Sequence, residues 1–110
     1  MREVSVGTNL VENTKTTVYT VPNGYYAKWN LCYVVNNTGN NKTISAWWYD
    51  TSEDEEFAVV SNYVLSPTQF LKFDGGAYVT LEEGDQVHLK SETGSTMAAI
   101  NTFELIRKGQ

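Results

Sequence analysis

The sequence is short of cysteine and of basic residues, and each shortage excludes a class of protein. Cys32 is the single cysteine among 110 residues, so the chain can form no internal disulfide and offers no thiolate cluster for a zinc ribbon. Eight basic residues against 13 acidic residues give a net charge of −5. Because this charge repels phosphate backbones, we expect no nucleic-acid partner.

Long hydrophobic runs are missing as well. No run approaches the roughly 20 apolar residues of a membrane-spanning helix, and the first residues contain Arg2 and Glu3 where a secretory signal has an apolar segment. We therefore expect a soluble, unprocessed protein with no membrane partner. The length predicts one domain over residues 1–110, large enough to bury a core without disulfides or a structural metal.

Residues that suit β-strands are abundant. Valine, isoleucine, threonine and the aromatic residues make up well over a third of the chain, a composition typical of pleated, half-buried surfaces. Clusters of turn-forming residues separate the apolar stretches at 21–24, 36–41, 66–67, 74–76, 82–85 and 92–95. This regular spacing predicts an all-β protein, a single antiparallel β-sandwich of jelly-roll or immunoglobulin-like type.

Alternation along the expected strands predicts which side chains face the core. In the longest strand one face carries Ala27, Trp29, Leu31, Tyr33 and Val35, and the other carries Tyr26, Lys28, Asn30, Cys32 and Val34. We predict that the first face is the core. The later segments add Phe70 with Lys72, Leu71 with Phe73, Val79 with Leu81, Val87 with Leu89, and Met97, Ala99, Phe103 and Leu105.

The two adjacent tryptophans cannot both enter one core. Ile44, Ala46 and Trp48 point to one face of their strand, and Thr43, Ser45, Trp47 and Tyr49 point to the other. One tryptophan therefore meets solvent, a partner or a ligand. The following segment, residues 52–60, is the one stretch that could form a helical turn, with Ser52 as its cap.

Catalytic chemistry has few candidate residues. Nucleophilic catalysis with a histidine base would depend on His88, the single histidine, and its position between Val87 and Leu89 predicts an exposed side chain that faces away from the core. The acidic run at residues 53–56 could collect calcium or act as an acid/base pair, but a run of like charges predicts a solvated loop. We expect no catalytic residue, no metal and no cofactor. Cys32 lacks a cationic neighbour in its strand, which predicts a packed, inert thiol.

The chain has more aromatic side chains than one small core can bury. Exposed aromatic side chains on rigid strands suit stacking on sugar rings or anchoring of a protein interface, and the alternative is that they cover the ends of the sandwich. We predict an interface that includes Trp47 and Tyr49, with Tyr25 and Tyr26 as weaker candidates.

Five short segments follow one another along the chain in an order that is typical of one group of proteins. They are Thr17-Val18-Tyr19-Thr20-Val21-Pro22-Asn23-Gly24, Val34-Val35-Asn36-Asn37-Thr38, Leu65-Ser66-Pro67-Thr68, Leu81-Glu82-Glu83-Gly84-Asp85-Gln86-Val87 and Phe103-Glu104-Leu105-Ile106. Between residues 16 and 106 the chain thus resembles small virion structural proteins of tailed bacteriophages. It departs from their small and aliphatic residues at Trp47-Trp48-Tyr49, in the middle strand.

The resemblance implies a β-sandwich on a phage particle, assembled in the bacterial cytoplasm. The first hypothesis is a non-enzymatic capsid decoration (cement) protein that binds the outside of the head through the major capsid protein or other virion proteins, as a homo-oligomer for which we expect a trimer. A component of the neck, tail or baseplate is the alternative within the virion. A carbohydrate-binding module acting in host adsorption, with a glycan partner, is the second hypothesis, and an enzyme that uses the acidic run is the third.

Overall fold

The chain folds into eight strands. The computed structural model describes residues 2–109, apart from the side chains of residues 74–78, and every regular element in the described part is a β-strand. The strands are β1 (Arg2–Leu10), β2 (Thr16–Thr20), β3 (Tyr25–Asn36), β4 (Lys42–Asp50), β5 (Glu55–Leu65), β6 (Phe70–Leu81), β7 (Gln86–Ser91) and β8 (Met97–Arg107). The prediction of an all-β protein is confirmed.

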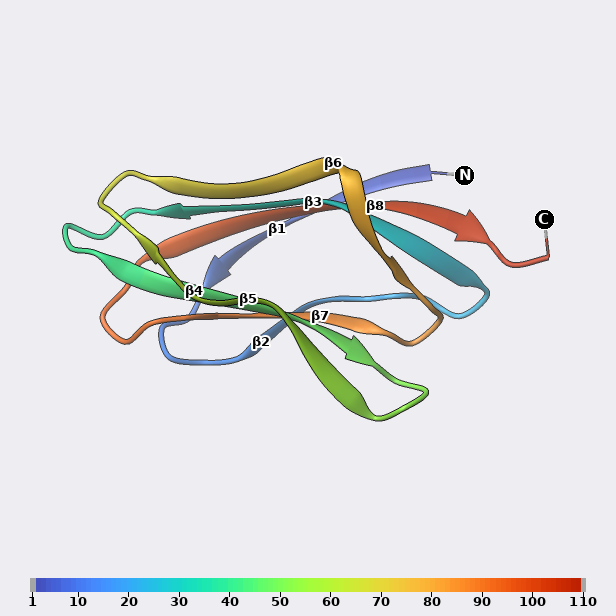
Figure 1. Cartoon of the computed structure of the whole chain (residues 1–110). Helices are drawn as coiled ribbons and strands as arrows, with labels where there is room; N and C mark the ends of the chain where they lie inside the picture. The colour runs from blue at the N-terminus through green and yellow to red at the C-terminus, as the bar shows by residue number, and fades with distance from the viewer. Residues whose placement is uncertain (1, 110) are drawn as a thin grey trace.

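The strands form two four-stranded antiparallel sheets that pack face to face (Figure 1). The upper sheet has the order β1-β8-β3-β6, and the lower sheet has the order β2-β7-β4-β5. Strand 1 pairs with strand 8, 2 with 7, 3 with 6 and 4 with 5, which is the pattern of one long hairpin folded over onto itself. This double Greek key is a jelly roll, and of the two sandwich types expected from the sequence it excludes the immunoglobulin-like one.

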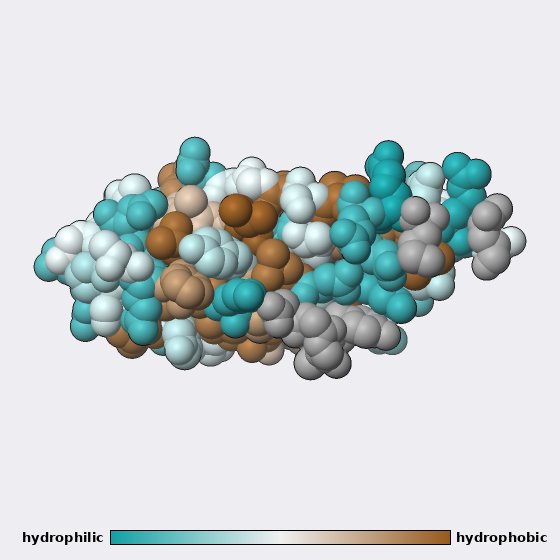
Figure 2. Space-filling model, turned by 90° about the horizontal axis from the view of Figure 1, so that it is seen from above, coloured by the Kyte–Doolittle hydropathy of each residue, from teal (hydrophilic) through white to brown (hydrophobic). Residues whose placement is uncertain are grey.

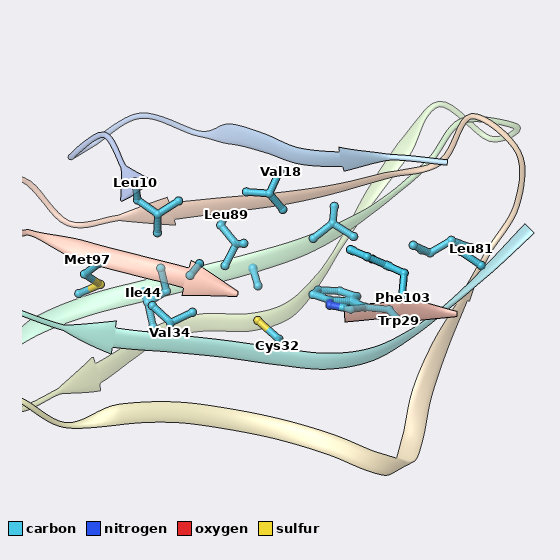
Figure 3. Close-up of a cluster of buried hydrophobic side chains, with 14 of the residues drawn as sticks. Leu10, Val18, Trp29, Cys32, Val34, Ile44, Leu81, Leu89, Met97 and Phe103 are labelled. Carbon is cyan, nitrogen blue, oxygen red and sulfur yellow. The ribbon is translucent and has the colours of Figure 1, made fainter. Parts of the chain in front are cut away.

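The core lies between the sheets and is densest around two aromatic side chains (Figure 3). Trp29 and Phe103 are fully buried, and the ring of Phe103 stacks on Tyr19 with a centroid distance of 4.2 Å. The Trp29 Nε1 donates a hydrogen bond of 3.0 Å to Asn101 Oδ1, so the polar atom of the indole is satisfied inside the sandwich. Each side chain of this size contributes about 3 kcal/mol through burial, and together they join β2, β3 and β8.

The prediction of the core face of β3 is correct for only half of the strand. Ala27 and Trp29 are buried as expected, but beyond them the buried residues are Cys32 and Val34. The register of β3 against both β6 and β8 shifts between Trp29 and Leu31. This bulge inserts one residue against β8, and because side chains alternate with a period of two, it exchanges the two faces for the rest of the strand.

The other predicted alternations are confirmed in β4, β7 and β8, where the inserted residue of each bulge lies in the partner strand. Ile44 and Ala46 are buried, and Trp48 packs against the core from the same face of β4. Val87 and Leu89 are buried in β7, as is the predicted set in β8, Met97, Ala99, Phe103 and Leu105. Alternation therefore locates the core reliably in strands that carry no inserted residue of their own.

Five of the six predicted turns separate strands. The turn at 82–85 shows the expected chemistry, because Gly84 adopts a φ of 85° and the carboxylate of Asp85 accepts a hydrogen bond from the backbone nitrogen of Glu82. The turn predicted at 74–76 is wrong, because those residues lie within β6. The one stretch that could form a helical turn, residues 52–60, does not form one: β5 begins at Glu55, and residues 51–54 form a hairpin turn in which Asp50 Oδ1 accepts the backbone N–H of Ser52.

Candidate functional site

The outer face of the lower sheet carries the two residues predicted as an interface. Trp47 and Tyr49 lie on β4 and point away from the core, as the alternation predicts. The Nζ of Lys15 lies 4.2 Å from the centroid of the Trp47 ring, and the Tyr49 ring stacks on His88 at 5.6 Å. Both aromatic side chains are half-buried by these neighbours, so they are fixed in place on the sheet. Their role as partner contacts stays a prediction.

His88 lies at the centre of a hydrogen-bonded cluster. It faces away from the core, as predicted, but the prediction that it is exposed is wrong, since only 13% of its side chain is accessible. Its Nδ1 lies 2.7 Å from Glu56 Oε2 and its Nε2 lies 2.7 Å from Gln86 Oε1. Alternation along β7 cannot show that a side chain of β5 and the ring of Tyr49 cover this histidine.

Glu56 extends the cluster to Lys15. Its Oε1 accepts a hydrogen bond of 2.6 Å from Lys15 Nζ. Burial opposes the ionisation of Glu56, but the hydrogen bonds and charges of Lys15 and His88 outweigh that effect and lower the pKa of this carboxyl. Of the solvated loop predicted for residues 53–56, Glu53 and Asp54 are exposed turn residues, Glu55 is exposed but begins β5, and the prediction is wrong for Glu56. No three histidine, cysteine, aspartate or glutamate side chains gather as a metal site among the described residues.

A polar hollow of about 270 Å³ lies on the same outer face, beside Trp47. Its floor comes from β4 and β7, where Ser45 and Lys90 are directly paired across the two strands. On the side of β5, the backbone N–H of Asn62 donates a hydrogen bond of 2.8 Å to Ser45 Oγ. The complete lining is Asn13, Thr43, Ser45, Trp47, Ser61, Asn62, Lys90, Ser91, Glu92 and Thr93.

The outer face of the upper sheet carries an apolar surface, which Figure 2 shows as a brown area between hydrophilic residues. A hollow of about 400 Å³ on this surface is lined by Leu31, Tyr33, Phe70, Lys72 and Ile100, and we call these five residues the apolar face. Phe70 is 53% exposed and Ile100 is 44% exposed. The rings of Tyr33 and Phe70 stack with a centroid distance of 5.2 Å, so the surface is rigid as well as apolar.

Two signals could have located the apolar face from the sequence. Ile100 alternates with the buried residues Ala99 and Phe103 of β8, so the sequence predicts that its side chain points outward. Phe70 alternates with Lys72, and both are exposed. Leu31 and Tyr33 could not be found in this way, because the bulge in β3 turns them outward.

Tyr25 and Tyr26 lie apart from Trp47 and Tyr49. They begin β3 in the upper sheet, whereas β4 belongs to the lower sheet. The hydrogen bond that Arg107 Nη2 donates to the Tyr25 hydroxyl, 3.3 Å long, lowers the pKa of this tyrosine. The structure therefore does not bring the four predicted interface residues into one surface, and any single partner would contact one pair or the other.

Two further features bear on chemistry and location. The Cys32 thiol is fully buried, and this burial raises its pKa to about 12, which agrees with the prediction of a packed, inert cysteine. No helix among residues 2–109 is both long and apolar enough to cross a membrane.

Comparison with known proteins shows the fold. No family model matches the chain, and no curated sequence matches it. A protein of the Bacillus endospore appendages, which form disulfide-linked pili, superposes with a TM-score of 0.58 at 15% identity, covering 96% of this chain and 85% of that one. The globular domain of the zebrafish complement 1qA protein gives a TM-score of 0.55 at 17% identity, covering 96% and 98%.

A third structure, a pentameric capsid protein isolated from metagenomic phage sequences, gives a TM-score of 0.43 at 19% identity, covering 94% of this chain and 62% of that one. At such low identities the first two likenesses show a shared jelly-roll fold and nothing beyond it. The third is too weak to show even that.

Proposed function

We propose that this protein is a non-enzymatic structural protein of a tailed-phage particle, a decoration protein that binds the major capsid protein on the outside of the head and stabilises it. The observation that carries the proposal is the apolar face on the outside of the upper sheet. The sequence resemblance between residues 16 and 106 supplies the partner, and the jelly roll supplies a rigid support.

The apolar face has the composition of a protein interface and not of an ordinary sheet exterior. Antiparallel sheets normally present polar side chains to water, whereas here Leu31, Tyr33, Phe70 and Ile100 lie together around one lysine. Contiguous exposed apolar surface of this kind marks interaction sites. Stacked aromatic and aliphatic side chains on a rigid sheet are also suited to concentrate binding energy in few residues.

The surroundings of the apolar face favour a flat, closely fitting partner. Ile100 is paired with Gly7 of the edge strand β1, and because glycine has no side chain, nothing rises beside Ile100 on that strand. Val35 is paired with Ala98 of β8 and with Phe70 of β6, which extends the apolar row by one step. A second flat β-surface, such as that of a shell protein, can therefore approach along the sheet.

The location is tested by quantitative mass spectrometry of phage particles from the source. A ratio to the major capsid protein near one supports decoration of the head. A ratio of a few per cent supports the alternative, a component of the neck, tail or baseplate. Absence of the chain from particles overturns the virion proposal. Sedimentation of the purified protein tests the accompanying proposal of a homo-oligomer, for which we expect a trimer.

The docking surface is tested by one pair of matched substitutions. Ile100→Ser removes an exposed aliphatic side chain from the apolar face, and Val64→Ser removes one, 55% exposed, from β5 in the other sheet. We expect Ile100→Ser to weaken binding to expanded heads at least tenfold in a co-sedimentation assay, and Val64→Ser to bind like the wild type. Equal binding of both variants contradicts a role for the apolar face.

A second function, carbohydrate binding during host adsorption, is favoured by a different observation. The polar hollow combines an indole with hydroxyl and amide groups, which is the combination that binds sugar rings through stacking and hydrogen bonds. The hollow and the apolar face lie on opposite outer faces of the sandwich. A protein docked through one face would therefore present the other to the surroundings.

A further inference from the structure

We infer that the polar hollow binds an acidic saccharide, with a sugar ring against Trp47 and the sugar carboxylate at Lys90. The inference rests on the second function proposed above and specifies its ligand class. Three observations carry it: the row of polar groups on the floor, the charge of the lining, and the placement of the indole.

The floor of the hollow presents polar groups in a row across three strands, of which the Ser45 hydroxyl donates within the protein to Asn62 Oδ1 at 3.4 Å. Lys90 of β7 is paired with Ser45 of β4, and Ser45 is hydrogen-bonded to Asn62 of β5. Asn62 adopts a φ of 47°, and the pairing of β4 with β5 shifts register between Ile44 and Ala46. This bulge re-aims the side chains of β5 at the hollow, so an ammonium, a hydroxyl and an amide lie along one line on the sheet.

The charge of the lining favours an anion at one position. Lys42, at the rim, donates a hydrogen bond of 3.0 Å to the carbonyl of Thr93 and lies 3.9 Å from Glu92. Glu92 in turn accepts the backbone N–H of Thr43 at 2.9 Å, so its carboxylate is engaged. Lys90 is half-buried and has no hydrogen-bond or ion-pair partner among the residues that the structure describes. An ammonium in this position is complementary to a carboxylate.

The indole of Trp47 forms one wall of the hollow. The Nζ of Lys15 lies 4.2 Å from the centroid of the ring, and Lys15 is not among the residues that line the hollow, so it supports the indole without occupying the hollow. Lys15 is itself held by Glu56. Because this support fixes the ring before any ligand arrives, stacking of a sugar on the hollow side requires little reorganisation. A pyranose has hydroxyl groups around its rim and an apolar ring face. The polar groups of Lys90, Ser45 and Asn62 suit the hydroxyl groups, and the indole suits the ring face.

Tryptophan fluorescence gives a direct measurement of binding. Trp29 is fully buried and Trp48 packs against the core, so a ligand in the hollow should alter the emission of Trp47 alone. We would titrate the full chain with trisaccharides of galacturonate, glucuronate, mannuronate and N-acetylneuraminate, each in parallel with its neutral methyl ester. The wild type should bind at least one acid ten or more times more tightly than the ester, and added salt should reduce the difference.

Matched variants assign the contacts. Lys90→Gln should lower the affinity for the acid to that for the ester. Lys108→Gln makes the same change of charge in the exposed turn after β8, beside the upper sheet, and should leave the affinity unchanged. Trp47→Phe should weaken both ligands at least fivefold and remove the fluorescence change, so its binding is measured by calorimetry. Circular dichroism should show that all three variants fold.

The outcomes separate the inference from the function on which it rests. If acids and esters bind equally, or if Lys108→Gln weakens binding as much as Lys90→Gln, the acidic ligand is overturned and carbohydrate binding stands. If no saccharide of either series binds, both are overturned. A preference for acids that is abolished by Lys90→Gln and retained by Lys108→Gln supports both.

Discussion

Asp85 offers the sharpest test of how two neighbouring turns at one end of the sandwich are held together. The residue is 1% exposed and its carboxylate accepts three hydrogen bonds. Oδ1 accepts the backbone N–H of Thr51 at 3.0 Å, and Oδ2 accepts Trp48 Nε1 at 3.1 Å and the backbone N–H of Glu82 at 2.9 Å. One side chain therefore joins the β4–β5 turn, the β6–β7 turn and the indole of Trp48.

The substitution Asp85→Asn keeps the shape of the side chain and removes the charge. An asparagine has one acceptor oxygen, so its amide group must face at least one of the three donors. Hydrogen bonds to a charged group contribute about 1.5–3 kcal/mol each, and a buried donor without a partner costs a similar amount. Allowing for relaxation of the two turns, we expect the free energy of unfolding to fall by about 3 kcal/mol.

The measurement is urea unfolding followed by tryptophan fluorescence. For a domain of this size, a loss of about 3 kcal/mol should also lower the melting temperature by more than about 10 °C. The control is Asp50→Asn, because the Asp50 carboxylate accepts the N–H and the hydroxyl of Ser52 in an exposed turn and its loss should cost less than about 0.5 kcal/mol. A loss below about 1 kcal/mol for Asp85→Asn, or equal losses for both variants, refutes the assignment of Asp85 as the residue that joins the turns.

Three further predictions concern the core, the thiol and the outer cluster. Phe103→Ala removes a ring stacked on Tyr19 and should lower the free energy of unfolding by about 4 kcal/mol in urea titrations; a loss under about 2 kcal/mol would show that the core collapses into the space. Cys32, whose pKa is raised to about 12 by burial, should react with Ellman's reagent in the native protein only as fast as the chain unfolds, and rapid labelling of the folded protein would contradict its burial. Glu56→Gln should destabilise the protein by about 0.5–1 kcal/mol at neutral pH. The pKa of Glu56 is lowered in the folded state from an ordinary value of 4.5. Its contribution to the free energy of unfolding is therefore present above that pH and is lost as the pH falls through the lowered value. The stabilities of variant and wild type should converge in acid, and a constant difference down to acidic pH would argue against the ion pair.

The cluster around His88 shows why its exposure could not be predicted from the sequence. Position 88 alternates with the buried residues Val87 and Leu89, which correctly predicts an outward side chain. Whether an outward side chain meets water depends on its neighbours across the sheet. Here Tyr49 covers the ring, and Glu56 arrives from a strand that is distant in sequence.

The prediction for the acidic run at residues 53–56 failed in part for a related reason. Four consecutive acidic residues predict a solvated loop, and three of them are exposed. The fourth, Glu56, is already in β5, where pairing with β4 places it beside Lys15 and His88. The candidate site on the lower sheet was therefore only partly predictable: Trp47 and Tyr49 follow from alternation, whereas Lys90, Ser45 and Asn62 become neighbours through strand pairing alone.

The sequence by itself determined the class of the fold, most of the turns and the buried faces of β4, β7 and β8. It could do so because turn chemistry and the period of two are local properties of the backbone. Tertiary structure decided the rest. The bulge after Trp29 reverses the faces of β3 and exposes Leu31 and Tyr33, and the order of strands brings β7, β4 and β5 together beneath the polar hollow. Both depend on contacts between segments far apart in the chain, and for that reason neither surface could be derived from any one segment alone.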